Sequence, residues 1–300
     1  MVFKSFWYGS RLGTREWLCL RSFTEHGHCV HLYTYDNRLA VPKGVSVKDA
    51  SAIYPEEDVF FYQDHAGQGG VSAFSNMFRY RLLYENGGWW IDMDVACTGA
   101  NIPEGERYYG RQGDGKINCA AMKFEKKSPV MEQCLETAER LGSDISWGDA
   151  GPRLFTKTLR TLGLADQAAP ARYAYPVSWP DAVSFYQPSK TEGIRSSLRE
   201  QNAPFLHFWN GTLSRAGIQS EIAPPKGSAL ARIANDLDVH WPCPDVRYSS
   251  AAVDRMARNL RRSRKLKAAR AKLDRIQDSR PWKVAVTLQR ILGGLRLRQE

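Results

Sequence analysis

The chain has 300 residues, of which 43% are hydrophobic and 11% aromatic, so it is a globular protein of one large or two modest domains rather than a disordered chain. Its net charge of +10 is concentrated at one end, as shown below. We expect neither a transmembrane helix nor a signal peptide, because no apolar run reaches about 18 residues and the N-terminus lacks an apolar core and a cleavage site. These features predict a cytoplasmic protein.

The expected elements alternate between strands and helices, most clearly in the first part of the chain. The expected strands cover residues 2–9, 29–35, 59–62, 89–91, 120–124 and 205–209. The expected helices cover residues 14–26, 72–86 and 129–141, with Ser72 as the N-cap of the second and Gly87-Gly88 at its end. This alternation predicts an α/β fold built on a parallel sheet.

Asp92 and Asp94 directly follow the apolar strand over residues 89–91. Residues two apart on an extended segment point to the same face, and two neighbouring carboxylates repel unless something neutralises them. Ligand sites in α/β folds lie at the carboxyl ends of strands, and carboxylate oxygens suit a hard divalent cation. We therefore predict a Mn²⁺ or Mg²⁺ site, the alternative being a solvated pair of surface aspartates.

The segment over residues 75–94, SNMFRYRLLYENGGWWIDMD, resembles the D-x-D block of the sugar-binding-region glycosyltransferases. That family includes capsular-polysaccharide transferases, yeast-type mannosyltransferases and clostridial glucosylating toxins. The resemblance implies a GT-A-like fold, a Rossmann-type nucleotide-sugar-binding sheet flanked by helices. It also implies metal-dependent, retaining transfer from a UDP- or GDP-sugar to a glycan or lipid-linked glycan acceptor, as in bacterial surface-polysaccharide synthesis.

The same resemblance implies roles for individual residues. Arg79, one helical turn after Asn76, is expected to act with Asp92 and Asp94 in catalysis by gripping the diphosphate or the sugar, unless it is a surface arginine. His207 is expected as the third metal ligand, or else as a core histidine. The residues expected to bind the donor are Trp7, Tyr8, Gly9, Asn76, Arg79, Gly88, Asn118, Asp149 and Trp209.

Several of these positions leave alternatives open. Asn76 stands where the family usually has Asp, so the donor sugar is not determined by the motif. Asn118 and Asp149 could cap turns instead of binding substrate. Asp149 belongs to a segment with Trp147, Gly151 and Pro152 that resembles a G-P segment of the family, and the resemblance as a whole ends near residue 215.

The C-terminal segment differs from the rest in charge. Residues 254–300 contain fifteen Lys or Arg and four Asp or Glu, a net of +11, which leaves about −1 for residues 1–253. We predict a catalytic domain over residues 1–242 and a basic, amphipathic helical tail over 243–300, with Asp278 or Ser279 capping its second helix.

Residues 252–298 have the pattern of helices that bind an anionic membrane surface, with Trp282 near the start of the second helix. This predicts peripheral association with the inner face of the cell membrane. The alternatives are a helical pair packed on the body or on another subunit, and a nucleic-acid-binding or scaffold protein. No nucleic-acid partner is expected, because the body is nearly neutral and has no reader motif.

Overall fold

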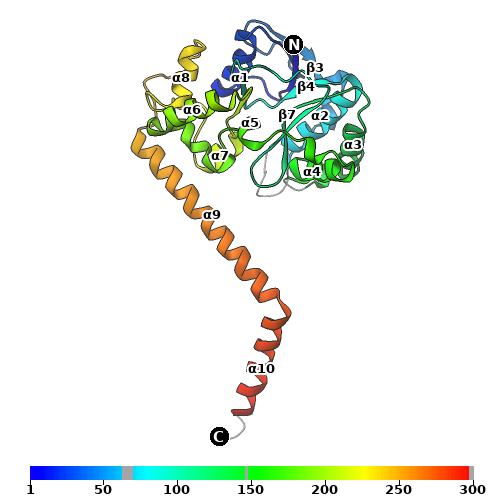
Figure 1. Ribbon diagram of the computed structural model, residues 1–300, viewed down its shortest axis with the longest axis vertical. Helices are drawn as coiled ribbons and strands as arrows, with labels where there is room; N and C mark the ends of the chain where they lie inside the picture. The colour runs from blue at the N-terminus through cyan, green and yellow to red at the C-terminus, as the bar shows by residue number, and fades with distance from the viewer. Residues whose placement is uncertain (63–69, 146–147, 297–300) are drawn as a thin grey trace.

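A computed structural model describes residues 1–62, 70–145 and 148–296, which form a mixed α/β body with a long C-terminal helical extension (Figure 1). The body is built on a six-stranded sheet of order β3-β2-β1-β4-β7-β6. Its strands are β1 (Val2–Phe6), β2 (Cys29–Thr34), β3 (Val45–Asp49), β4 (Gly88–Ile91), β6 (Tyr108–Arg111) and β7 (Ile117–Phe124). The first four are parallel to one another, β7 is antiparallel to β4, and β6 is antiparallel to β7.

Helices cover both faces of this sheet. One face carries α2 (Ser72–Asn86), α3 (Pro129–Leu141) and α4 (Pro152–Thr161). The other carries α1 (Thr14–Glu25) and a two-stranded sheet of β5 (Val95–Cys97) and β8 (Phe205–His207). Successive side chains of β4 therefore enter opposite cores: Trp89 and Ile91 pack on the α1 side and Trp90 on the α2 side. Burial on both faces explains the unbroken apolar run of this strand.

Short helices form the second half of the body, on the α1 side of the sheet. The α-helices are α5 (Ala171–Ala174), α6 (Thr191–Gln201), α7 (Asn210–Arg215) and α8 (Ala229–Asp236). Among the described residues, the 3₁₀ helices are η1 (Ala50–Ala52), η2 (Glu56–Asp58), η3 (Gly142–Asp144), η4 (Ala165–Gln167), η5 (Trp179–Tyr186) and η6 (Pro188–Lys190). Apolar residues of η5, α6, α7 and α8 join the same buried cluster as α1.

One predicted strand is wrong. Residues 59–62 are irregular, and the third strand of the sheet is instead β3, which pairs in parallel with β2. The apolar run was predicted as a strand, but its Phe60 packs against the ring of Phe74 of α2, at 5.8 Å between centroids, and the segment does not pair with a described strand. Strand β3 has little apolar signal because it lies at the edge of the sheet, where most of its side chains are exposed.

Helix α2 has the bounds expected from its pattern, but its N-terminus differs in detail. Val71 occupies the N-cap position and makes no side-chain capping bond, so the expected Ser72 cap is wrong. Gly87 ends the helix with a φ of 59°. A Cβ on Gly87 would lie 2.6 Å from the backbone nitrogen of Lys126, so both its conformation and its close approach require glycine.

The C-terminal extension consists of α9 (Ser250–Asp278) and α10 (Arg280–Arg296), which lead away from the body (Figure 1). The start of α9 packs on the body: Val253 and Ala257 are buried, and the guanidinium of Arg264 lies 4.5 Å from the ring centre of Trp179. Beyond residue 264 nearly all described side chains are exposed. The packing thus favours a boundary well after residue 242. In the described part of the chain, no helix has both the length and the apolar character needed to cross a bilayer.

Candidate active site

Asp92 and Asp94 lie in the turn between β4 and β5, which we call the acidic turn. The Val95 amide donates to the Asp92 carbonyl at 3.0 Å, so the segment is a tight turn and not the extended stretch expected. The two carboxylates nevertheless interact. Burial raises the pKa of Asp92, and the negative charge of Asp94 adds to this rise against the lowering by Arg79. The acidic turn therefore concentrates two partly buried negative charges at the carboxyl end of a parallel strand.

Helix α2 places Arg79 directly against Asp92. Arg79 Nη2 lies 2.9 Å from Asp92 Oδ1, and its Nη1 donates to the carbonyl of Cys119 at 2.8 Å. The indole of Trp90 donates a further bond of 2.7 Å to Asp92 Oδ1. Arg79 is only 4% exposed, and in this structure its guanidinium contacts Asp92 and Cys119. The expected contact of Arg79 with a diphosphate stays a prediction.

Strand β8 and helix α7 hold Asp94. His207 Nε2 lies 3.1 Å from Asp94 Oδ1, and the backbone amide of Asn210 donates to Asp94 Oδ2 at 2.8 Å. Burial raises the pKa of Asp94, but His207 and the Asn210 amide outweigh it, so the pKa lies below its ordinary value. Trp209 stacks on the His207 ring at 3.8 Å between centroids. Residues 207–209, which we call the H-x-W segment, thus hold the second carboxylate of the acidic turn.

Two residues of this cluster were missed by sequence reasoning. The side chain of Asn210 donates through Nδ2 to Glu16 Oε1 at 2.8 Å. Glu16 lies in the first turn of α1, and burial, together with the charge of Asp94, raises its pKa. The position of Asn210 beside the H-x-W segment was an available signal. Nothing local pointed to Glu16, because its partner is 194 positions away.

Trp7, Tyr8 and Gly9 follow β1 at the same edge of the sheet as the acidic turn. Strands β1 and β4 are parallel neighbours, and the hydroxyl of Ser5 donates to the carbonyl of Ile91 at 2.8 Å. The Trp7 Nε1 is buried without a partner among the described residues. Tyr8 packs edge-on against Tyr35, at 6.1 Å between ring centroids. Aromatic side chains therefore surround this end of β1.

Asn76 lies one turn before Arg79 on α2, with 7% of its surface exposed. The thiol of Cys119 donates to Asn76 Oδ1 at 3.8 Å. A Cβ on Gly151 would lie 3.5 Å from Asn76 Nδ2, so the G-P segment reaches α2 beside Asn76. Asp149 of that segment pairs with Arg153 at 2.9 Å, whereas Trp147 lies outside the described residues.

Asn118 is joined to the His207 side of the site through Tyr175. Its Nδ2 donates to Gln112 Oε1 at 2.7 Å, and its Oδ1 accepts a bond of 3.5 Å from the Tyr175 hydroxyl. The ring of Tyr175 lies 5.6 Å from that of His207. Asn118 therefore links Gln112 to Tyr175, whose ring packs near His207, a partner of Asp94 in the acidic turn.

Gly88 lies apart from these residues. It begins β4 and pairs with Phe124, whereas Asp92 follows the opposite end of the same strand. The expected contact between Gly88 and the donor therefore has no structural support. Its φ of 85° explains the glycine by backbone conformation alone.

No group of three or more His, Cys, Asp or Glu among the described residues is arranged as a ready-made metal site. Asp92, Asp94 and His207 are brought together, but His207 is used to bind Asp94. Any cation at the acidic turn would therefore depend on oxygen ligands from water or substrate as well, which is the usual arrangement for Mg²⁺ in phosphate chemistry.

Comparison with known proteins supports the predicted class of enzyme. Residues 123–237 match the sequence family described as "Alpha 1,4-glycosyltransferase conserved region". This region contains His207, Trp209 and Asn210 but not the acidic turn. The glycosyltransferase class expected from the sequence is confirmed at the level of this conserved region.

Individual relatives are distant. The lactosylceramide 4-alpha-galactosyltransferase of Homo sapiens is 24% identical over 151 residues, which cover 47% of this chain and 42% of that protein. An uncharacterised protein of Arabidopsis thaliana is 24% identical over 190 residues, 58% of this chain and 28% of that protein. The chain thus spans less than half the length of these relatives. Among solved structures, the PaToxG glycosyltransferase gives a TM-score of 0.40 at 10% identity, covering 79% of this chain and 84% of that one.

Proposed function

We propose that this chain is a metal-dependent, retaining glycosyltransferase that transfers a sugar from a UDP- or GDP-sugar to a glycan or lipid-linked glycan acceptor, as in bacterial surface-polysaccharide synthesis. The observation that carries the proposal is the acidic turn, in which Arg79 orients Asp92 while His207 and Asn210 orient Asp94. The conserved region over residues 123–237 supports the class of reaction.

The donor set of the acidic turn fits Mn²⁺ or Mg²⁺. Four carboxylate oxygens lie in one short turn, and burial penalises their unneutralised charge. In the described structure, the Asp92 oxygens accept from Arg79 and Trp90, and the Asp94 oxygens from His207 and Asn210. Each oxygen has two lone-pair directions, so several remain for a cation. Asp92 and Asp94 would hold the metal, and His207, which contacts Asp94, would lie next to it.

The proposed chemistry follows from where charge develops. When the bond between sugar and diphosphate breaks, negative charge accumulates on the leaving phosphate, and a bound Mn²⁺ or Mg²⁺ would stabilise it as a Lewis acid. The residues of the chain pre-organise this site, because Arg79 pairs with Asp92 and His207 pairs with Asp94. Trp7 and Tyr8 are proposed to contact the nucleotide, and Asn76 the donor sugar.

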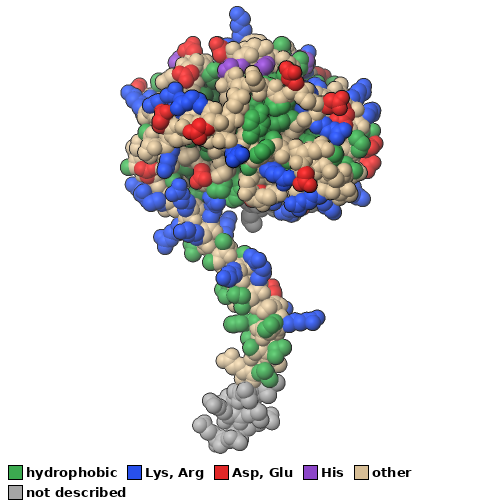
Figure 2. All heavy atoms as spheres, in the orientation of Figure 1, with side chains coloured by type: hydrophobic (Ala, Val, Ile, Leu, Met, Phe, Trp, Pro, Cys, Tyr) green, Lys and Arg blue, Asp and Glu red, His purple; other side chains and the backbone are tan. Residues whose placement is uncertain are grey.

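The tail is proposed to hold the enzyme on an anionic membrane surface at the inner face of the cell membrane. It is basic throughout, and it leaves large apolar side chains exposed, including Leu266 at 62% and Trp282 at 43%. Figure 2 shows blue basic and green apolar side chains along this extension. Anionic lipids attract such segments, and apolar side chains enter the headgroup region. A lipid-linked acceptor would then meet the catalytic domain at the membrane.

Donor hydrolysis by the full chain tests the catalytic proposal without knowledge of the acceptor. We expect one nucleotide sugar in a panel of UDP- and GDP-sugars to be hydrolysed slowly with Mn²⁺ and not with EDTA. Binding to an oligonucleotide that exceeds binding to UDP or GDP, with no hydrolysis of any donor, would instead support the alternative of a nucleic-acid-binding protein.

A further inference from the structure

The first turn of α1 carries a buried carboxylate close to the acidic turn. Glu16 is 7% exposed, and its side chain folds back over Gly13, the residue that precedes the helix. A Cβ on Gly13 would overlap Glu16 Oε2. The φ of Gly13 is −75°, which any residue can adopt, so glycine is needed at this position because it leaves room for the carboxylate.

Glu16 is joined to Asp94 through one residue, Asn210. Glu16 Oε1 accepts a 2.8 Å bond from Asn210 Nδ2, and the backbone amide of Asn210 donates at 2.8 Å to Asp94 Oδ2. Asn210 Oδ1 is buried without a partner among the described residues. The bond to Glu16 is therefore the contact that fixes the Asn210 side chain.

The backbone that presents the Asn210 amide is strained. Trp209, which precedes Asn210 at the start of α7, lies in the left-handed region with a φ of 59°. A bulky side chain rarely adopts this conformation, and it persists only where surrounding contacts fix it. The bond between Asn210 and Glu16 supplies one such contact from α1.

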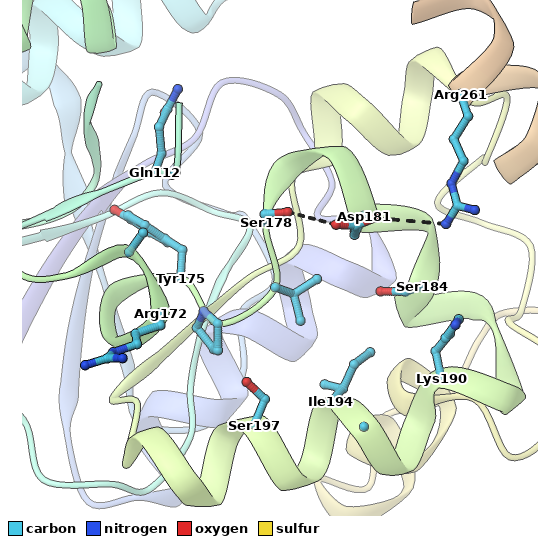
Figure 3. A pocket seen from close by; sticks show the side chains of 15 residues that line it. Gln112, Arg172, Tyr175, Ser178, Asp181, Ser184, Lys190, Ile194, Ser197 and Arg261 are labelled. Carbon is cyan, nitrogen blue, oxygen red and sulfur yellow. Dashed lines mark hydrogen bonds and ion pairs between the residues drawn. The ribbon is translucent and has the colours of Figure 1, made fainter. Parts of the chain in front are cut away.

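The contacts on the other side of this segment border open space. The ring of Tyr175 lies 5.6 Å from that of His207 and 5.4 Å from that of Trp209, and the carbonyl of Val177 accepts a 2.8 Å bond from the Trp209 indole. Both Tyr175 and Val177 also line a cavity of about 440 Å³ (Figure 3). Atoms that border a void lack packing partners on that side. The strained turn at Trp209 therefore depends on its α1 side for support.

The charge of Glu16 also reaches the acidic turn. Burial raises the pKa of Glu16, and the negative charge of Asp94 adds to the rise, so the two carboxyl groups are within electrostatic reach. Glu16 can thus act on Asp94 in two ways, by holding Asn210 and by adding negative charge. Substitutions that keep or remove the hydrogen-bond acceptor separate the two.

We propose that Glu16 is a positioning residue of the acidic turn, which through Asn210 holds the Asp94 carboxylate in the orientation that binds the divalent cation. The inference rests on the proposed metal-dependent function. Without Glu16, the Asn210 side chain loses its partner, the start of α7 relaxes, and the backbone bond to Asp94 weakens. Affinity for the cation then falls although no metal ligand has been removed.

Mn²⁺ binding to the full chain tests this role without any substrate. Free Mn²⁺ is measured by electron paramagnetic resonance while the protein is titrated, and Asp94→Asn defines the loss expected when the site itself is damaged. We expect Glu16→Ala to weaken Mn²⁺ binding about tenfold, the lower end of the range for residues that support a metal ligand. Glu16→Gln keeps an oxygen that can accept from Asn210 Nδ2, so it should weaken binding by less than about threefold.

Gly13→Ala tests the same contact without removing the carboxylate. The added methyl group would occupy the position of Glu16 Oε2, so the Glu16 side chain must move and its bond to Asn210 should weaken. Mn²⁺ affinity should then fall by up to about tenfold. Gly193→Ala is the matched control, because a Cβ on Gly193 of α6 would meet no described atom within 4 Å. This control should bind Mn²⁺ like the unmodified chain.

Failure of this inference and failure of the proposed function give different results. If Glu16→Ala binds Mn²⁺ like the unmodified chain, if Glu16→Gln loses as much affinity as Glu16→Ala, or if Gly193→Ala loses as much as Gly13→Ala, the positioning role of Glu16 is wrong. The acidic turn and donor hydrolysis are unaffected by those outcomes. If the full chain binds no Mn²⁺, the inference is wrong as well, and if it also hydrolyses no donor, the proposed function itself fails.

Discussion

The acidic turn and the C-terminal tail are built in opposite ways. The turn is held by residues far apart in the sequence, such as Arg79 on α2 and Asn210 on α7, and its partners Arg79 and His207 are buried. The described contacts of the tail beyond residue 264 are local to its helices, and its side chains are exposed. The site therefore depends on the folded body, whereas the outer tail does not. Chemistry and location should be separable by mutation.

Replacing a carboxylate of the acidic turn should have the largest effect. Asp92→Asn or Asp94→Asn keeps the shape of the side chain but removes its charge, so donor hydrolysis with Mn²⁺ should fall at least about 100-fold, the scale for losing one electrostatic group at a reacting phosphate. The measurement is turnover of the nucleotide sugar together with the melting temperature.

Asp166→Asn provides the control for this pair. Asp166 is a fully exposed carboxylate that pairs with Arg111 at 3.3 Å, so its loss should leave both turnover and melting temperature nearly unchanged. Near-normal activity of either Asp92→Asn or Asp94→Asn would remove the acidic turn from the mechanism.

Substitution of Arg79 tests how strongly its buried ion pair with Asp92 stabilises the protein. Arg79→Ala leaves the Asp92 carboxylate without its main partner, and removing one member of a buried pair costs about 3–5 kcal/mol of the free energy of unfolding. Activity should fall as well. Arg79→Lys should recover part of the stability but less of the activity, because an ammonium cannot reproduce the forked contact to Asp92 and Cys119.

The comparison residue lies two positions along the same helix. Arg81 pairs with Glu139 at a partly exposed position and stacks on the ring of Tyr54 at 3.8 Å, contacts that together contribute about 1–2 kcal/mol. Denaturant unfolding of Arg79→Ala and Arg81→Ala should therefore differ by several-fold in the loss of unfolding free energy. Equal losses would show that the Arg79–Asp92 contact does not anchor the turn.

Truncation tests the tail. Removing residues 268–300 deletes eight Lys or Arg and three Asp or Glu together with Trp282, but leaves the packed start of α9. This variant should no longer sediment with anionic liposomes, while its donor hydrolysis stays unchanged. The full chain should be released from the liposomes by high salt, because exposed charges are screened.

A longer C-terminal truncation provides the comparison. Removing residues 251–300 also deletes Val253, Ala257 and Arg264, which pack on the body, so this shorter form should melt at a lower temperature. A full chain that ignores anionic liposomes would contradict the membrane proposal. Equal stability of the two truncated forms would show that the start of α9 is dispensable to the fold.

How far the sequence predicted this structure depended on whether the signal was local. Helix α2 and helix α3 were predicted with the bounds observed, because apolar spacing and terminal glycines are local signals. Strand β3 was missed because an exposed edge strand has no apolar pattern, and its place is fixed by pairing with β2. The apolar run at residues 59–62 was predicted as a strand because it is apolar, although its Phe60 packs on α2 and the run does not join the sheet.

The candidate site divides in the same way. The acidic turn and His207 could be found from motifs, since each lies beside a recognisable strand. The contacts of Arg79 could not, because its position on a helix face does not reveal that Asp92 and the Cys119 carbonyl lie beside its guanidinium. Glu16 and Tyr175 were missed because their contacts arise only when α1, α5 and β8 come together in the fold.

Asn76→Asp should have the smallest effect on rate and the most specific one. Asn76 is buried beside Cys119 and Gly151, so a carboxylate there changes the charge of the surface proposed to face the donor sugar without changing its shape. We expect the ranking of nucleotide sugars in the hydrolysis panel to change, with the best rate altered only a few-fold. Asn86→Asp, at the exposed end of the same helix, is the control and should keep the original ranking. Identical donor rankings for Asn76→Asp and the unmodified chain would show that residue 76 does not contact the sugar, and donor choice would then have to arise from residues nearer Trp7 and Tyr8.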